Sequence, residues 1–200
     1  MKRRLIVGIS GATGIIYGIR LLEALRETSV ETHLIVSKAA EVTRTYETEL
    51  SSQDLRNLAD ISYPIGDIGA PIASGSFRTM GMIIAPCSIK TMSELANGIT
   101  SNLLTRAGDV VLKERRRLVL LLRESPLTTI HLRNMLALSE SGAVIAPPVP
   151  AFYALPKTID EMVKHTVGRV LDLFDIDTDF SRWGEQSSDV PSASAISNRG

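Results

Sequence analysis

The stretch Leu5–Gly18, which reads LIVGISGATGIIYG, constrains the fold of this chain more than any other. It begins with a short apolar run typical of a β-strand, and glycine, serine and threonine then crowd into the positions up to Gly14. Beyond Gly14, apolar residues recur at three- and four-residue steps, which predicts a helix. A strand, a tight turn and a helix in immediate succession open a βαβ unit.

The tight turn between this strand and helix admits two interpretations. Its main-chain N–H groups and the positive end of the helix dipole would make an anion site suited to phosphate. Glycine lets the chain turn sharply and lets a ligand approach the main chain. The alternative is a βα turn that binds nothing. The hydroxyl groups of Ser10 and Thr13 favour a phosphate-bearing ligand.

The rest of the chain alternates predicted strands and helices. Further strands are expected at 31–36, 62–65, 81–85, 118–122 and 143–146, and helices at 38–49, 51–60, 89–96, 101–116, 128–140 and 158–174. This alternation predicts an α/β fold with a single doubly wound, Rossmann-like parallel sheet, in the three-layer α/β/α arrangement also seen in flavodoxin. We expect one domain over residues 1–185 and a disordered tail over 186–200, where serine, alanine and proline prevail.

Polar residues follow several of the predicted strands. Ser37 ends the second strand and Ser88 follows the strand that Pro86 is expected to close. Ligands of open parallel sheets bind at these carboxyl ends, so both serines are candidate contacts, although each could equally cap the next helix. Arg123 and Glu124 directly follow a buried strand and are expected on the ligand rim. The loop 66–76 is expected near the ligand.

Composition argues against several classes of protein. The 22 basic and 22 acidic side chains cancel, so no strong field draws the chain to nucleic acid or membrane. No apolar run reaches the roughly 18 residues of a spanning helix. The single cysteine, Cys87, excludes an internal disulfide and suits a cytoplasmic protein. The three histidines are far apart in sequence, and no metal site is expected.

A nicotinamide-dependent oxidoreductase is the main alternative on these residues. The glycines of the first loop fit a dinucleotide-binding spacing, and Tyr153–Lys157 fits the YxxxK pair of short-chain dehydrogenases. However, Pro156 breaks the helix that this pair needs. The second strand also ends at Ser37 without the acidic residue that holds an NAD ribose. A nicotinamide enzyme is therefore the minor interpretation.

A series of segments resembles, in order, the UbiX-type flavin prenyltransferases, also called phenylacrylic or aromatic acid decarboxylases. They extend from the first strand to Trp183 and read GISGATGIIYG, SKAAEVTRTYET, ASGS, PCSIKT, LLTRAGDVVLKERR, LVLLLRESPL, HLRNM, GAVIAPPVPAFY and RWGE. The resemblance implies that the chain binds FMN and moves the dimethylallyl group of dimethylallyl phosphate to N5 and C6 of reduced FMN. It also implies a homo-oligomer, a dodecamer with sites shared between subunits, which delivers prenylated FMN to a UbiD-type decarboxylase.

The resemblance also assigns site residues, position by position. It implies that FMN is contacted by Gly11, Ala12, Thr13, Ser37, Ser88, Ile89, Lys90, Thr91, Arg106 and Arg123. It places Tyr153 and Arg169 on the prenyl phosphate, beside Lys113, Arg123 and Glu124, and it gives Glu124, Lys113 and Glu47 catalytic roles. Cationic side chains would then assist loss of phosphate without a metal, and Glu124 would relay a proton. Phe152, Tyr153 and Trp183 are the candidates for an apolar wall around the prenyl group.

Two further functions stay open. An FMN-dependent decarboxylase would act on aromatic acids directly, and a non-catalytic carrier would only hold the flavin. The basic cluster Lys113–Arg117, taken alone, is more typical of a solvated helix end than of a site. A set of Lys, Arg and Glu beside the flavin would nevertheless have no purpose in a carrier. The cysteinyl-peptide decarboxylases carry a His and an Asn-rich motif that this sequence lacks.

Overall fold

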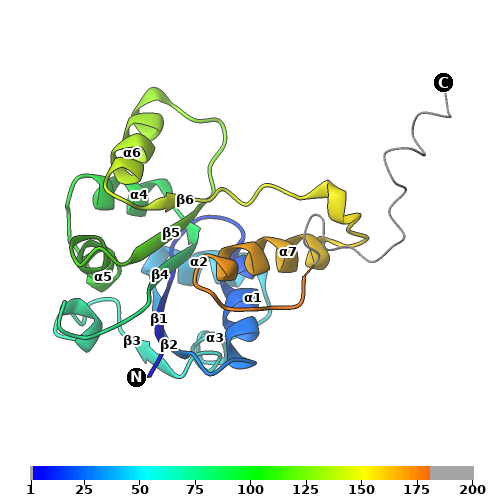
Figure 1. Ribbon diagram of the computed structural model, residues 1–200, viewed down its shortest axis with the longest axis horizontal. Coiled ribbons are helices and arrows are strands. Elements are labelled where there is room, and N and C mark those ends of the chain that lie inside the picture. The colour runs from blue at the N-terminus through cyan, green and yellow to red at the C-terminus, as the bar shows by residue number, and fades with distance from the viewer. Residues whose placement is uncertain (1, 181–200) are drawn as a thin grey trace.

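The computed structural model describes residues 2–180, in which six parallel strands form one sheet with helices on both faces (Figure 1). The strands are β1 (Arg4–Ile9), β2 (Glu31–Val36), β3 (Ile61–Tyr63), β4 (Gly81–Cys87), β5 (Arg117–Leu122) and β6 (Val144–Ile145). Their order is β3-β2-β1-β4-β5-β6. This is the order of dinucleotide-binding sheets and differs from the 2-1-3-4-5 order of flavodoxin, although the three layers are common to both. The predicted doubly wound α/β fold is confirmed.

The helices form one layer on each face of the sheet. One layer contains α1 (Ile15–Arg26), α2 (Lys38–Glu47), α3 (Ser52–Arg56) and α7 (Ile159–Asp172). The other contains α4 (Ile89–Ala96), α5 (Leu103–Lys113) and α6 (Thr129–Glu140). Two short 3₁₀ turns, η1 (Pro71–Ala73) and η2 (Phe152–Ala154), lie in the connections. Figure 1 shows η2 in a segment that reaches away from the sheet before α7 returns to it.

Each layer has its own apolar core, and the central strands contribute to both. In β1, Leu5, Val7 and Ile9 face the α1 layer, whereas Ile6 faces the α5 layer. Successive side chains of a strand point to opposite faces, so a strand covered on both sides must be apolar at every position. This is why β1 and β5 appear in the sequence as unbroken apolar runs.

Most of the predicted elements differ from the structure at their ends, and two of these differences stand out. Pro86 does not close its strand, since β4 continues to Cys87, and the pairing with β5 shifts register between Ile84 and Cys87. The shift accommodates a residue that has no N–H to give to the ladder. The helix expected over 51–60 ends at Arg56. Trp183, the limit at 185 and the predicted tail 186–200 lie outside the described residues. Within residues 2–180, no helix combines the length and apolar character needed to cross a membrane.

A charged cluster lies at the amino edge of the sheet, around Glu31. Its Oε1 accepts a hydrogen bond from Nε of Arg4 at 2.8 Å and lies 3.1 Å from Nε2 of the buried His33, and Oε2 pairs with Lys2. The hydrogen bond from Lys2 above all, with those from Arg4 and His33, lowers the pKa of the Glu31 carboxyl to about 2 in spite of its burial. The folded state therefore favours the ionised carboxylate.

We expect the free energy of unfolding to fall as the pH falls from about 4.5 to about 2, the interval between the ordinary and the lowered pKa of Glu31. A carboxyl with a lowered pKa stabilises the fold above this interval and loses that contribution as it is protonated. Glu31→Gln should reduce the loss of unfolding free energy between pH 7 and pH 3 by about 1 kcal/mol. The effect is this small because Lys2 is exposed, and solvent weakens its ion pair with Glu31. Urea unfolding at both pH values measures it.

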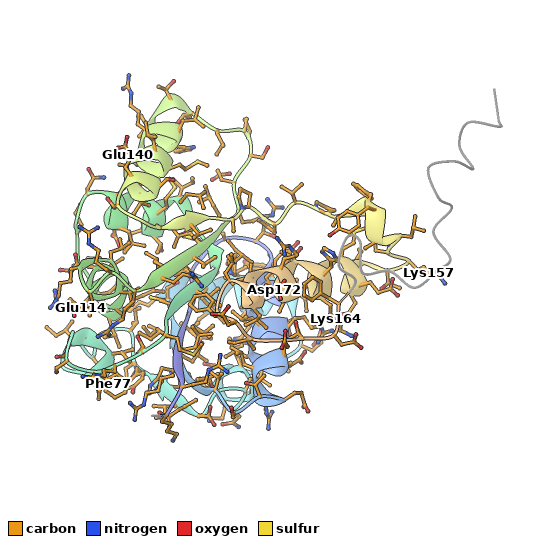
Figure 2. The ribbon with its side chains drawn as sticks, in the orientation of Figure 1. Phe77, Glu114, Glu140, Lys157, Lys164 and Asp172 are labelled. Carbon is orange, nitrogen blue, oxygen red and sulfur yellow. The ribbon has the colours of Figure 1, made fainter. Side chains whose placement is uncertain are left out.

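Glu140→Gln provides the matched control, because Glu140 is an exposed carboxyl at the end of α6 (Figure 2). An unchanged pH dependence in Glu31→Gln would contradict the interpretation of this cluster.

Candidate active site

The candidate site lies where the chain leaves β1 and β4 in opposite directions. These strands are neighbours, but β1 leads to α1 on one face and β4 leads to α4 on the other. Such a switch point opens a crevice at the carboxyl ends of the strands, where open α/β sheets bind ligands. A cleft of about 780 Å³ lies there, a volume suited to a small-molecule ligand. It is lined by Gly11, Ser37, Lys38, Ala39, Ile65, Gly66, Ser88, Ile89, Lys90, Thr91, Glu94, Ser101, Asn102 and Glu124.

Three helices begin at the wall of this cleft: α2, α4 and α5. Their N-cap residues are Ser37, Ser88 and Asn102, and each side chain accepts a hydrogen bond from an N–H of its own first turn. The remaining N–H groups of a first turn have no partner within the helix, and the helix dipole makes that end positive. Three such ends around one cleft favour a ligand that carries phosphate.

The first turn of α4 is the part of the cleft that best matches the sequence prediction. Ser88, Ile89, Lys90 and Thr91 all line it, as expected from the position of Ser88 after β4. The side chain of Lys90 is 82% exposed and lies 3.9 Å from Glu94, so it is mobile enough to move to an anion. This turn therefore combines main-chain N–H groups, two hydroxyls and a cation.

The first loop does not provide the open anion site that its sequence suggested. Oε2 of Glu47 accepts hydrogen bonds from the N–H groups of Gly14 at 2.8 Å and Ile15 at 3.0 Å. The hydroxyl of Thr13 also bonds to this carboxylate. The N-terminus of α1 therefore already holds an anion, supplied by the end of α2.

Glu47 is kept ionised by this arrangement. Partial burial opposes ionisation, but the hydrogen bonds from Thr13, Ile15 and Gly14 and the positive charge of Arg123 outweigh it, and the pKa of the carboxyl lies below its ordinary value. Glu47 is thus placed at the carboxyl edge of the sheet, although it does not line the cleft. Its contacts are those of a helix cap.

Gly11 lines the cleft, yet packing explains why it is glycine. A Cβ at this position would lie 2.2 Å from the Cβ of Ala39 at the start of α2. Gly14 is glycine for another reason, because its φ of +95° is a left-handed conformation at the N-cap of α1. Neither glycine requires a ligand to account for it.

Ser10 also differs from its expected role as a ligand donor. It is 1% exposed, and its Oγ donates to the carbonyl of Pro86 at 3.0 Å and accepts from the N–H of Ser88 at 2.7 Å. The N–H of Ser10 reaches the same Pro86 carbonyl at 3.1 Å. The residue joins the ends of β1 and β4 and fixes the start of α4.

Arg123 and Glu124 leave the end of β5 in different directions. Glu124 lines the cleft, and its Oε1 accepts a hydrogen bond from the N–H of Ser125 at 3.0 Å. The charge of Arg123 acts on Glu47 and on Tyr17, where it opposes the rise in the pKa of the tyrosine that burial produces. Successive residues of an extended segment point to opposite faces. Glu124 therefore contributes to the cleft, and Arg123 contributes its charge to the side of Glu47 and Tyr17.

Tyr153 and Arg169 line a second pocket of about 310 Å³, between α7 and the segment after β6. The phenol oxygen of Tyr153 lies 3.1 Å from Nε2 of His165, and Nη1 of Arg169 lies 3.2 Å from Oδ2 of Asp172. Val149 and Val170 contribute apolar walls. The structure brings the two predicted phosphate ligands together, in a pocket separate from the larger cleft.

Lys113 does not lie beside Tyr153 and Arg169 of its own chain. The α5 helix starts at the cleft and ends at the opposite edge of the sheet, where Nζ of Lys113 is 2.6 Å from Oε1 of Glu114. Figure 2 shows Glu114 on the far side of the molecule from Lys164 of α7. Arg106 also turns away from the cleft, because its guanidinium bonds to the carbonyl of Ala73 and to Asp109.

Comparison with known proteins agrees with this geometry. Residues 1–171 match the model of the Flavoprotein family. The chain is 58% identical over 181 residues to the flavin prenyltransferase UbiX of Thauera aromatica. The alignment covers 90% of this chain and 93% of that protein. The chain belongs to the UbiX flavin prenyltransferase family.

Two solved structures of UbiX proteins share the fold. The crystal structure of AnUbiX (PadA1) in complex with FMN and dimethylallyl pyrophosphate has a TM-score of 0.91 and 52% identity, over 94% of this chain and all of that one. A dodecameric FMN-dependent UbiX-like decarboxylase from Escherichia coli O157:H7 has a TM-score of 0.89 and 53% identity, over 92% of this chain and all of that one.

Several residues that line the two pockets of this UbiX-family chain were not predicted from the sequence, among them two polar residues of the cleft and a histidine. Asn102 and Glu94 line the cleft, and His165 contacts Tyr153. Asn102 could have been found, since it precedes the apolar run of α5 as an N-cap does. His165 could also have been found, because it lies four residues before Arg169 and so on the same face of α7.

We expect Ser10→Ala to lower the free energy of unfolding by about 1–3 kcal/mol. It removes the hydroxyl that satisfies the buried N–H of Ser88, and a buried donor without a partner costs free energy of this order. Urea denaturation measures the change. Ser76→Ala removes a hydroxyl from an exposed loop and should change stability by less than about 0.5 kcal/mol. Equal effects of the two substitutions would show that Ser10 does not join the strand ends.

Proposed function

We propose that this chain is a flavin prenyltransferase that transfers the dimethylallyl group of dimethylallyl phosphate to N5 and C6 of reduced FMN, releasing phosphate. The observation that carries the proposal is the cleft at which the N-termini of α2, α4 and α5 converge, in a chain of the UbiX family. We further propose that the prenylated FMN passes to a UbiD-type decarboxylase.

The donor set of the cleft fits FMN. Main-chain N–H groups and hydroxyls of Ser88 and Thr91 would hold its phosphate at the first turn of α4, near the exposed Lys90. Ser37, Gly11 and the apolar Ile89 would contact the rest of the flavin. No acidic residue follows β2 to hold an NAD ribose, since Val36 is followed by Ser37 and Lys38. We propose Ala12, Thr13 and Arg123 as further contacts at the same edge.

The pocket of Tyr153 and Arg169 fits the prenyl donor. When the allylic C–O bond breaks, negative charge grows on the phosphate and the allyl group becomes cationic. The guanidinium of Arg169 and the phenol of Tyr153 would bond to the phosphate oxygens and stabilise that charge. Val149 and Val170 would exclude water from the prenyl group, and Phe152 and Trp183 are further candidates for this wall.

Glu124 is proposed as the group that moves the proton. Bond formation at N5 breaks the allylic C–O bond and releases the N5 proton, which the departing phosphate can take up. Ring closure then adds a proton to the allyl double bond while C6 loses its own, and a carboxylate in the cleft would carry protons between these groups. Glu47, held ionised at the start of α1, is proposed to act beside it by its charge and position.

Incubating the protein anaerobically with reduced FMN and dimethylallyl phosphate tests the function. Mass spectrometry should show a flavin heavier by one prenyl unit, formed without added divalent metal. Glu124→Gln should bind FMN normally but form product about 10²-fold more slowly, as expected for loss of a general acid–base group. Glu49→Gln, at an exposed carboxyl beyond α2, is the control and should retain full activity.

Two outcomes of this assay would contradict the proposal. Release of CO₂ from an aromatic acid by the chain alone, without a prenylated flavin, would identify the FMN-dependent decarboxylase for which one relative is named. FMN binding with no product from either donor, the monophosphate or the pyrophosphate found with AnUbiX, would identify a flavin carrier.

We also propose that the chain assembles into a dodecamer and that Lys113 and Arg106 act at the site of a neighbouring subunit. Both side chains face away from the cleft of their own chain, and a UbiX-like relative is dodecameric. Large apolar side chains are exposed on α6, on the segment before α7 and at the first residue of α7, which favours burial between subunits. They include Ile130, Leu132, Leu136, Val149, Phe152, Leu155 and Ile159.

Mixed oligomers test the shared site. Lys113→Ala and Glu124→Gln should each be nearly inactive alone, but co-expressed differently tagged subunits should regain about a quarter of the wild-type activity. In a random mixture, one site in four receives an intact Lys113 from one chain and an intact Glu124 from another. Light scattering on the same sample reports the size of the assembly. A mixture that stays inactive would place both residues in the same chain, against the proposal.

The remaining expectations are also kept as proposals. We propose that residues 1–185 form a single FMN-binding domain. We propose a cytoplasmic location, because the sequence holds one cysteine, Cys87, and a reducing compartment suits a protein without disulfides. Burial raises the pKa of the Cys87 thiol, which keeps it protonated and unreactive.

A further inference from the structure

We propose that His165 is a positioning residue that fixes the direction in which the Tyr153 hydroxyl donates its hydrogen bond. The inference rests on the proposed function, because it assumes that Tyr153 meets a phosphate oxygen of the prenyl donor. It goes beyond that function because it assigns the orientation of the Tyr153 hydroxyl to His165, a residue outside the predicted site.

The geometry holds His165 firmly against Tyr153. His165 is 8% exposed, and its Nε2 lies 3.1 Å from the phenol oxygen. The two rings are perpendicular, with an interplanar angle of 82° and a centroid distance of 5.5 Å. Phe180 packs against the imidazole at 5.3 Å and 86°. The ring therefore sits between two aromatic side chains that restrict its rotation.

His165 also lies in the same pocket as the cation that would bind the phosphate. Arg169 follows it by one helical turn on α7, and both side chains line the 310 Å³ pocket with Tyr153. The three groups thus converge from one helix and one 3₁₀ turn. A shift of Tyr153 relative to α7 would separate the phenol from the guanidinium.

The chemistry of the ligand determines the direction of the hydrogen bonds. Ionised phosphate oxygens only accept, so Tyr153 must donate its O–H to the phosphate. Its phenol oxygen keeps lone pairs that can accept a hydrogen bond, and Nε2–H of His165 is placed to give one. A hydrogen bond in the opposite direction, from the phenol to Nε2, would turn the O–H away from the ligand. The chain His165 Nε2–H to Tyr153 O–H to phosphate also strengthens each member by polarisation.

Two substitutions separate this role from simple packing. His165→Leu removes the donor at a similar volume, whereas His165→Gln keeps an amide N–H at a comparable reach. His165→Leu should raise KM for dimethylallyl phosphate about 5–10-fold, the loss expected for one hydrogen bond, and leave kcat within about twofold. His165→Gln should restore KM to within about twofold of wild type. Val163→Ala, which removes buried volume from the same helix, should leave KM unchanged.

A double-substitution cycle shows whether His165 acts through Tyr153. In the Tyr153→Phe background the phenol oxygen is absent. Adding His165→Leu to it should therefore weaken the binding of dimethylallyl phosphate by less than about twofold. Isothermal titration of the FMN-loaded protein with dimethylallyl phosphate gives the same comparison without turnover. The ¹⁵N resonances of the His165 ring should report Nε2–H in the ligand-bound wild type and should shift in Tyr153→Phe.

Three results would each overturn the inference. They are additive effects in the cycle, a His165→Gln variant as impaired as His165→Leu, and an unprotonated Nε2 of His165 in the ligand-bound state. If wild-type protein makes no prenylated flavin, the proposed function fails, and titration and the ¹⁵N resonances still decide the role of His165. If His165→Leu does not fold, His165→Gln and Tyr153→Phe carry the same decision.

Discussion

The buried hydroxyl of Ser10 is the interaction on which the site depends. β1 and β4 are paired but send their chains to opposite faces, so a contact beyond the regular ladder must hold the two loops together. Ser10 does so by bonding to the carbonyl of Pro86 and to the N–H of Ser88. The second bond orients the residue that caps α4, and α4 supplies the first-turn N–H groups of the cleft. Through its N–H and its buried hydroxyl, Ser10 therefore links the core of the sheet to the first turn of α4.

The fold could be predicted from the sequence because strands buried on both faces are apolar at every position, as in β1 and β5. The carboxyl edge followed from the same pattern, and it placed Ser37, Ser88 and Glu124 correctly on one cleft. The contents of the first loop could not be predicted. Glu47 lies 33 residues away from Gly14, and no local pattern shows that its carboxylate caps α1. A glycine-rich turn looks the same in sequence whether its N–H groups are free or already bonded.

The position of Lys113 could have been predicted from the sequence, because the order of strands and helices determines it. A helix that begins at the carboxyl edge of a parallel sheet must return to the amino edge before the next strand. The α5 helix begins at Leu103, and its 11 residues span about 16 Å. Lys113 at its last turn is therefore carried away from Glu124 of the same chain. Topology alone predicts that a family role for Lys113 requires a second subunit, whereas family resemblance by itself does not say which chain supplies the residue.

The two charged residues after β5 act on different sides of the sheet edge. The cleft lies between the first turns of α2, α4 and α5, and the pocket of Tyr153 is lined by α7 and the segment after β6. Glu124 faces the cleft, while the charge of Arg123 acts on Glu47 and Tyr17 on the α1 side. Because successive residues of an extended segment point to opposite faces, the strand end presents a carboxylate to the cleft and a cation to the α1 side, which a helix or a turn at this position would not do.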